Sequence, residues 1–298
     1  MPHIPVLLQE TLHSLGLAPG MFVIDATVGS GGHATAIMER IQPGGMLLGI
    51  DWDPEMARRA QERLAQGKGK YMVVRGNYAE LPDILHAHGL PRADALLFDF
   101  GFSSEQLEMS ERGFSFTSEG PLRLTYSPES IPAYEVLAAS SEDELTRIFR
   151  EFGEERWARR IARAVKAEME NLRVPREMTA RRFAEIVARA VPRGKGRRIH
   201  PATRAFQALR IYVNYELDNI ARAMANIPRV VAQGGRVAAI SFHSLEDRIV
   251  KQWLQKMSRA GVMKILTKKP ITPSANEKES NPRSRSAKLR AGELLNAV

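Results

Sequence analysis

A glycine-rich turn separates an apolar segment from a helical pattern near the start of the chain, in the sequence Asp25-Ala-Thr-Val-Gly-Ser-Gly-Gly-His33. Asp51 follows at the end of the next apolar segment. Glycines let such a turn tighten and let a cofactor lie against the backbone, and an acid about 20 residues on can bind ribose hydroxyls. The pattern therefore predicts a site for a nucleotide-containing cofactor. A structural turn with solvated acids is the alternative.

The glycine order and the surrounding acids favour S-adenosylmethionine over a dinucleotide. NAD sites typically require G-x-G-x-x-G, whereas the glycines here are Gly29, Gly31 and Gly32. S-adenosylmethionine has no pyrophosphate, and its sulfonium and amino groups are cationic, so an acidic mouth suits it. The acids that could provide one are Asp25, Asp51, Asp53 and Asp99.

Asp99-Phe-Gly-Phe-Ser-Ser104 ends a predicted strand, where ligands of parallel sheets collect. The letters DFG also occur in protein kinases, but no H-R-D loop precedes them, which excludes that class. A carboxylate and two hydroxyls could instead hydrogen-bond an amino group undergoing alkylation. We therefore predict Asp99, Ser103 and Ser104 as catalytic residues, with a turn-capping role for Asp99 as the alternative. Phe100 and Phe102 are candidates to stack on an unstacked base.

Two later motifs complete the set. Ser241-Phe-His-Ser-Leu-Glu-Asp-Arg248 leaves another strand, with His243 at its carboxyl end and Ser244 and Asp247 spaced like a capping box. Asn281–Arg290 has the composition of a basic strand at a sheet edge. No cluster of metal ligands is apparent, so we expect no metal.

Apolar strands alternate with helices over the first hundred residues, which predicts a parallel, doubly wound α/β sheet. The next strand, 236–242, begins only after the 136 residues from 100 to 235, far more than one crossover needs. That interval has helical patterns, including one long helix over 203–224, and a polar loop is expected at 273–282. We therefore predict an all-α domain inserted into the sheet domain. The sheet domain would comprise residues 1–107 and 203–298, and the helical insert residues 108–202.

The charge is unevenly distributed. Residues 1–149 carry 11 Lys and Arg against 20 Asp and Glu, and residues 150–210 carry 17 against 7, within a net charge of +9. A basic centre suggests a polyanionic partner such as RNA, although a heat-adapted surface composition would look similar. The candidate RNA-binding residues are Arg193, Lys195, Arg197, Arg198, Arg204, Arg283 and Arg285.

The cysteine content and the lengths of the apolar runs exclude several classes of protein. There are no cysteines, which excludes disulfides and thiolate metal sites and suits a reducing compartment. No apolar run approaches a membrane span, and the first 20 residues lack the pattern of a secretory signal. We expect a cytoplasmic protein without a membrane partner. The sequence leaves a homo-oligomer open.

Together these motifs resemble the bacterial ribosomal RNA small subunit methyltransferase H family, formerly MraW. The resemblance covers nearly the whole chain and includes long literal segments: His3–Leu8, Gly31–His33, Glu111–Phe116, His200–Asn214, Ser241–Lys251 and Asn281–Arg290. It implies a class I S-adenosylmethionine-dependent methyltransferase, with a Rossmann-like sheet and an inserted all-α domain. The implied activity is methylation of N4 of a cytidine in 16S ribosomal RNA, within an assembling 30S particle. The implied cofactor residues are Gly31, Gly32, His33, Asp51, Tyr78, Asp99 and Gln106.

The chain departs from the family pattern at two segments. Where the family usually reads D-L-G-V-S-S-P-Q-L-D, this chain has Phe100, Phe102 and Glu105, and the proline is lost. Where the family usually reads G-P-L-D-M-R-M, this chain has Gly120-Pro-Leu-Arg-Leu-Thr-Tyr126, with Arg123 and Thr125 in place of an acid and an arginine. The alternative is therefore a non-catalytic or differently targeted methyltransferase-fold RNA-binding protein.

Overall fold

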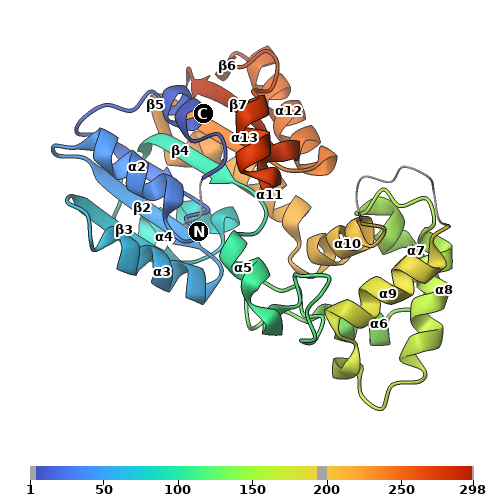
Figure 1. The fold of residues 1–298 in the computed structure, drawn as a ribbon. Coiled ribbons are helices and arrows are strands. Elements are labelled where there is room, and N and C mark those ends of the chain that lie inside the picture. The colour runs from blue at the N-terminus through green and yellow to red at the C-terminus, as the bar shows by residue number, and fades with distance from the viewer. Residues whose placement is uncertain (1–4, 193–199, 297–298) are drawn as a thin grey trace. The chain divides into compact units, whose positions relative to one another are not determined.

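The computed structural model describes residues 5–192 and 200–296, and of Ser104, Glu108 and Ser110 the backbone alone. These residues form two compact units: Met1–Phe102 with Leu217–Val298, and Ser103–Glu216 (Figure 1). The boundaries expected from the sequence lay after residues 107 and 202. No helix in the described part of the chain is long and apolar enough to cross a membrane.

The first unit contains a seven-stranded sheet in the order β3-β2-β1-β4-β5-β7-β6. The strands are β1 Phe22–Asp25, β2 Met46–Asp51, β3 Lys70–Arg75, β4 Ala93–Asp99, β5 Val231–Ser241, β6 Met263–Ile265 and β7 Lys288–Leu294. The first five pair in parallel, and β7 pairs antiparallel with both β5 and β6. Because β2 and β4 lie on opposite sides of β1, the strand order reverses there, and the carboxyl ends of β1 and β4 form the switch point where such sheets bind ligands.

Both faces of this sheet are buried, which explains the uninterrupted apolar character of its strands. Alternate residues of β4 enter different clusters: Leu96 and Phe98 pack with α4, α11 and α12, whereas Ala95 and Leu97 pack with α1, α2 and α3. The helices of this unit are α1 Leu8–Leu15, α2 Gly32–Ile41, α3 Pro54–Leu64, α4 Leu81–Ala87, α11 Glu216–Val230, α12 Ser244–Arg259 and α13 Ala275–Ser280, with 3-10 turns at Tyr78–Glu80 and Pro282–Ser286.

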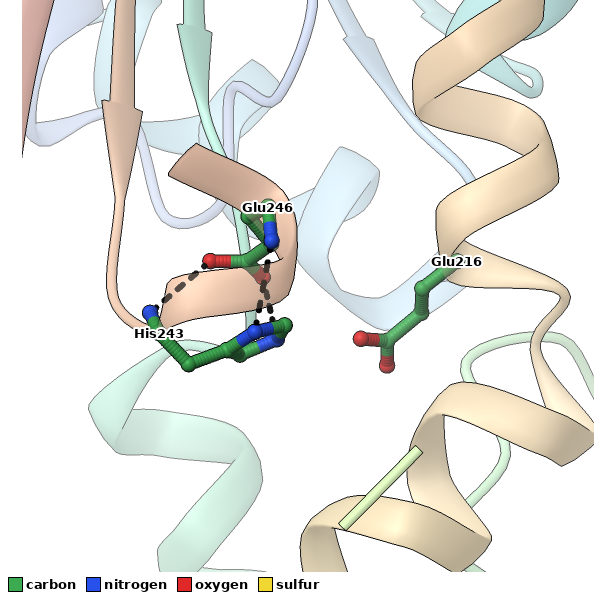
Figure 2. Close-up of side chains that lie close together, drawn as sticks. All are labelled: Glu216, His243 and Glu246. Carbon is green, nitrogen blue, oxygen red and sulfur yellow. Dashed lines mark hydrogen bonds and ion pairs between the residues drawn. The ribbon is translucent and has the colours of Figure 1, made fainter. Parts of the chain in front are cut away.

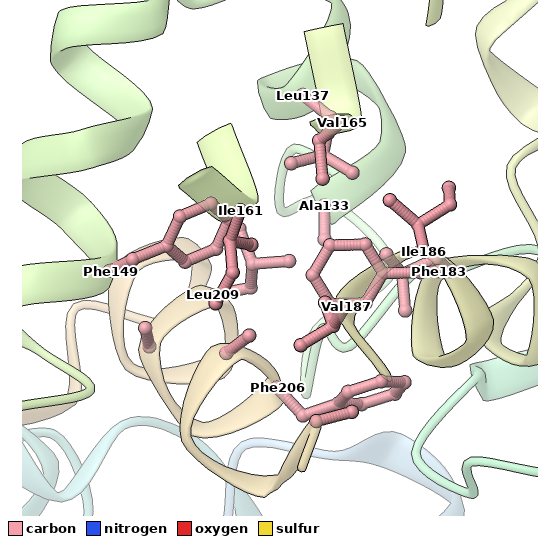
Figure 3. Packing of buried hydrophobic residues seen from close by; sticks show 14 of the residues in the cluster. Ala133, Leu137, Phe149, Ile161, Val165, Phe183, Ile186, Val187, Phe206 and Leu209 are labelled. Atoms are coloured by element: carbon pink, nitrogen blue, oxygen red, sulfur yellow. The ribbon is translucent and has the colours of Figure 1, made fainter. Parts of the chain in front are cut away.

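The second unit is helical. Its helices are α5 Ser104–Glu108, α6 Ala133–Ala139, α7 Glu142–Glu151, α8 Ala158–Met169, α9 Ala180–Ala190 and α10 Thr203–Val213, with 3-10 turns at Ser110–Arg112 and Pro175–Glu177. One apolar cluster holds it together, with Phe149, Phe183 and Phe206 contributed by α7, α9 and α10 (Figure 3). The helix α10 thus belongs to this core, which is why the unit extends beyond residue 202.

The structure corrects the single helix predicted over 203–224. The helix α10 ends at Val213, and Tyr215 adopts a left-handed conformation with φ 51° before α11 begins. The side-chain amide of the fully buried Asn214 donates to the carbonyl oxygens of Arg210 and Leu124, at 2.9 and 2.7 Å. The apolar period continues on both sides of the break because each helix buries a face, so periodicity alone could not reveal it.

Two predictions near the carboxyl end are also wrong. The expected polar loop at 273–282 contains α13, whose Ser274 caps the helix by accepting from the Glu277 N–H. The expected basic edge strand begins only at Lys288, and β7 lies between β5 and β6 rather than at the edge. Local polarity concealed α13, in which Glu277 Oε1 makes a distant contact by accepting from the Leu7 N–H at 2.8 Å.

Candidate functional site

The glycine-rich turn connects β1 to α2 at the switch point of the sheet. Gly29 and Gly31 have φ values of 52° and 86°, a left-handed conformation that favours glycine. At position 32 glycine is favoured for a steric reason, because an added Cβ would lie 2.8 Å from Pro5 Cγ. Two of the three glycines therefore provide the backbone turn, and the third admits the amino-terminal segment.

Asp51 fixes this turn from the end of β2. Its Oδ2 accepts from the Gly29 N–H and its Oδ1 from the Asp53 N–H, both at 2.9 Å. The adjacent Asp53 caps α3 through the Glu55 N–H and is fully buried. Asp51 itself stays partly exposed beside the glycines. Asp53 thus has a structural role, whereas Asp51 presents a carboxylate at the turn.

His33 and Asp99 lie next to each other across the switch point. His33 Nδ1 is 3.5 Å from Asp99 Oδ2, and His33 Nε2 is 3.1 Å from the Val6 carbonyl oxygen. Because a carbonyl oxygen can only accept, Nε2 must carry a hydrogen, which leaves Nδ1 directed at the carboxyl group. Sequence reasoning missed Val6 as the residue that orients His33, although its segment belongs to a motif that carries the family resemblance.

Burial sets the charge of the carboxyl groups at this edge. Asp25 is buried, and loss of solvation raises its pKa to about 7; the Thr27 N–H opposes this rise and the Asp51 charge adds to it. The pKa of Asp99 is also well above its usual value, because of burial first and then the charges of Asp25 and Glu246. The Asp99 side chain keeps 22% of its surface exposed, while its Oδ1 is buried without a hydrogen-bond partner in the described residues. A cation bound here would relieve this repulsion.

Tyr78 belongs to an aromatic cluster with Phe98 and Phe100. Its ring centroid lies 5.9 Å from that of Phe98 and 5.8 Å from that of Phe100, and the two phenylalanine rings stack at 5.4 Å. Phe100 is only 3% exposed, so the expectation that it could stack on a base is wrong: the core occupies its ring. Phe102, at 39% exposed, keeps an accessible ring.

Ser103, Ser104 and Gln106 lie in the helical unit, at the start of α5. Ser103 Oγ accepts from the Gln106 N–H at 3.2 Å, and Gln106 Oε1 accepts from the Ser103 N–H at 2.9 Å. This is a reciprocal capping box, a pattern readable from the sequence but not recognised there. The pair thus has a structural role beside any part in binding.

A second capping box corrects the prediction made for Ser244 and Asp247. The cap of α12 is His243, whose Nδ1 accepts from the Glu246 N–H, while Glu246 Oε2 accepts from the His243 and Phe242 N–H groups (Figure 2). Asp247 instead accepts from Arg290 Nε at 2.6 Å and Lys288 Nζ at 3.1 Å, and these contacts lower its pKa despite its burial. The capping box thus lies one residue earlier than predicted, because Asp247 is bound by Lys288 and Arg290 of β7. The local sequence does not show that contact.

The segment Gly120–Tyr126, which departs from the family pattern, is held in the helical unit by hydrogen bonds to its backbone carbonyl oxygens. Arg112 Nη2 donates to the carbonyl oxygens of Thr125 and Tyr126, both at 3.0 Å, and Asn214 binds Leu124 as described above. Thr125 is only 2% exposed. The replacement at position 125 is therefore accommodated inside the fold.

The candidate RNA-binding residues are dispersed. Arg283 and Arg285 are exposed on the 3-10 turn before β7, in the sheet unit. Arg204 is exposed on α10, in the helical unit, and its Nη1 donates to the Glu154 carbonyl oxygen at 3.0 Å. Arg193, Lys195, Arg197 and Arg198 lie outside the described residues.

The profile of the MraW methylase family matches residues 1–295. The chain belongs to the MraW methylase family. Curated relatives named ribosomal RNA small subunit methyltransferase H agree: those of Dehalococcoides mccartyi strain BAV1 and Caldicellulosiruptor bescii are 42% and 43% identical. The alignments cover 99% and 98% of this chain, and 87% and 99% of the relatives.

Membership of this family identifies the activity and the cofactor of the protein. The protein is an S-adenosylmethionine-dependent methyltransferase with the class I, Rossmann-like sheet. The site described above fits that cofactor, because glycines open the turn and mutually repelling carboxyl groups lie where a cationic sulfonium would be favoured. The acidic residues at the ends of β1, β2 and β4 are thus compatible with the cofactor's charge.

Replacing Asp51 with alanine should weaken S-adenosylmethionine binding by about 1.5–3 kcal/mol, the range for a hydrogen bond to a charged group. Calorimetry on the folded variant measures this. Asp94→Ala is the matched control, because Asp94 Oδ2 also accepts a backbone N–H, that of Phe22 at 2.8 Å, at the opposite end of β1. It should lower stability while leaving cofactor affinity unchanged; equal losses in both variants would contradict the assignment of Asp51.

Replacing Asp25 with asparagine should make stability less dependent on pH. With a folded pKa near 7 and an unfolded value of 3.8, the native state binds more protons, so this residue lowers the unfolding free energy as pH rises from about 4 to about 7. Asp25→Asn removes that loss, by up to a few kcal/mol. Urea unfolding at pH 5 and pH 8 should show the variant gaining relative to wild type at the higher pH. A constant difference would mean that Asp25 ionises normally.

Proposed function

We propose that this protein methylates the exocyclic N4 of a cytidine in small-subunit ribosomal RNA. The curated relatives are named for small-subunit ribosomal RNA methylation, and the sequence resemblance implies the cytidine N4 position. The observation that carries the proposal is the Asp99 carboxyl group, at the end of β4 and beside the glycine turn, with a raised pKa and one edge accessible. An acceptor in that position suits an amine that must lose a proton.

The cofactor would be held by the turn and its neighbours. Gly31, Gly32 and His33 line the start of α2, and Asp51 can accept from ribose hydroxyls beside them. Tyr78, Asp99 and Gln106 complete the proposed set. When bound, S-adenosylmethionine supplies an electrophilic methyl group on a positively charged sulfur.

Asp99 would act on the target amine. The lone pair of a cytosine amino nitrogen is delocalised into the ring, so the nitrogen must be held about 3–3.5 Å from the methyl carbon and allowed to rehybridise. A carboxylate that accepts an N–H hydrogen bond favours this, and the bond strengthens as positive charge develops on nitrogen. The raised pKa of Asp99 lets it take the proton after transfer. Ser103 and Ser104 would assist.

RNA would reach the site as an unstacked base. The accessible ring of Phe102 can stack on it, and Arg204, Arg283 and Arg285, with the basic residues 193–198, can contact phosphates. The RNA partner would be the assembling 30S particle in the cytoplasm. The proposal requires no metal.

The direct test compares ribosomal RNA from cells with and without the gene by mass spectrometry of its nucleosides. We expect N4-methylated cytidine in small-subunit RNA to decrease on deletion and to return on complementation. An unchanged nucleoside profile would refute the proposed substrate.

Replacing Asp99 with asparagine should slow single-turnover methylation by about 10²–10³, as for loss of one preorganised electrostatic partner. Asparagine keeps the shape but removes the charge, so RNA affinity should change little at saturating cofactor. Because Asp99 must be ionised to accept, the wild-type rate should rise with pH through its raised pKa, and that rise should disappear in the variant. A rate within threefold of wild type would assign the acceptor role to another group, Ser103 first.

A further inference from the structure

The arginines of α8 and of the turn before it, Arg156 to Arg163, fall into two groups in their ion pairing. Arg159 Nη2 binds Asp143 Oδ1 at 2.8 Å, and Arg163 Nε lies 3.6 Å from Glu142 Oε2, so both charges are balanced by acids of α7. Arg156 and Arg160 have no carboxylate within ion-pair distance anywhere in residues 5–192 and 200–296. The segment from Arg156 to Arg163 therefore carries both balanced and unbalanced cations.

Both unbalanced guanidinium groups lie over one aromatic ring. The Cζ atoms of Arg156 and Arg160 are 5.1 and 5.7 Å from the ring centroid of Trp157. The indole is half-buried and packs against the apolar core of the helical unit, so its position is fixed. A cation–π contact of this kind restrains each guanidinium group, and both arginines remain exposed, so their N–H groups can still donate.

A third arginine is held against the same turn. The hydrogen bond from Arg204 Nη1 reaches the carbonyl oxygen of Glu154, three residues before Trp157. A Cβ on Gly153 would lie 2.6 Å from the Arg204 carbonyl oxygen, so α10 approaches the turn closely there. We call the exposed guanidinium groups of Arg156, Arg160 and Arg204, with the Trp157 ring, the Trp157 surface; Glu154 is its exposed acid.

We infer that the Trp157 surface binds the phosphate backbone of a single-stranded segment of the substrate RNA. Planar guanidinium groups bind phosphate oxygens through paired N–H donors, and aromatic rings with arginines recur in sequence-tolerant RNA binding. An arginine that is already held over an aromatic ring loses less conformational freedom on binding than a free one, and an arginine without an ion pair has none to break. This inference rests on the proposed function in taking RNA as the substrate.

The test measures binding of the full-length protein to a small-subunit ribosomal RNA fragment by fluorescence anisotropy over a range of KCl concentrations. Arg156→Gln with Arg160→Gln should weaken binding about tenfold or more and make the slope of log affinity against log salt shallower by about 0.7 per lost phosphate contact. Arg159→Gln with Arg163→Gln is the matched control, because it lies in the same eight-residue segment and changes the net charge equally, but these arginines are already paired. It should stay within threefold of wild type.

Two further readouts separate this inference from the proposed function. Methylation by the Arg156/Arg160 variant should show a raised KM for RNA with kcat unchanged, whereas failure of the proposed function would abolish modification by the wild type itself. Arg156→Lys with Arg160→Lys keeps the charges but not the paired donors, and it should recover only part of the affinity. Equal RNA affinity and equal salt slopes for the two Gln variants would overturn the inference and leave the surface to an acidic protein partner.

Discussion

The crowding of carboxyl groups at the carboxyl ends of the buried central strands β1 and β4 is the constraint on which the site depends. Parallel strands end together, so Asp25 and Asp99 are brought close by the same pairing that buries Ile24 and Phe98. Loss of solvation and mutual repulsion raise both pKa values. Such an edge favours a cationic ligand and a carboxyl group that can exchange a proton near neutral pH.

The other features of the sheet unit maintain this edge. Asp51 ties the glycine turn to the end of β2, Thr27 Oγ1 accepts from the Asp99 N–H at 2.6 Å, and the Val6 carbonyl orients His33. Each contact joins segments well separated along the chain. The polar groups that would otherwise be free to rotate are therefore held in place before any ligand binds, which lowers the cost of organising the site.

The helical unit differs from the sheet unit in that it carries most of the chain's arginines. Its apolar core is complete in itself, so its surface can carry many arginines, most of them on α8, α9 and neighbouring loops. Some are neutralised within the unit, including the buried Arg210, which binds both oxygens of Glu216 at 2.8 and 3.0 Å. Others, such as Arg156, keep an accessible cation. Total charge therefore describes this surface less well than the pairing of each arginine.

The sequence by itself determined the parallel sheet, because β2, β4 and α3 follow local signals: continuous apolar strands, and a proline after a capping aspartate. It also located the glycine turn, Asp51 and Asp99, since their types and spacing are local. Only the tertiary structure decided which groups are already engaged. The break at Asn214, the burial of Phe100 and the pairing of Asp247 with β7 each depend on a partner far away in the chain. Periodicity reports which face of an element is buried, but not what that face meets.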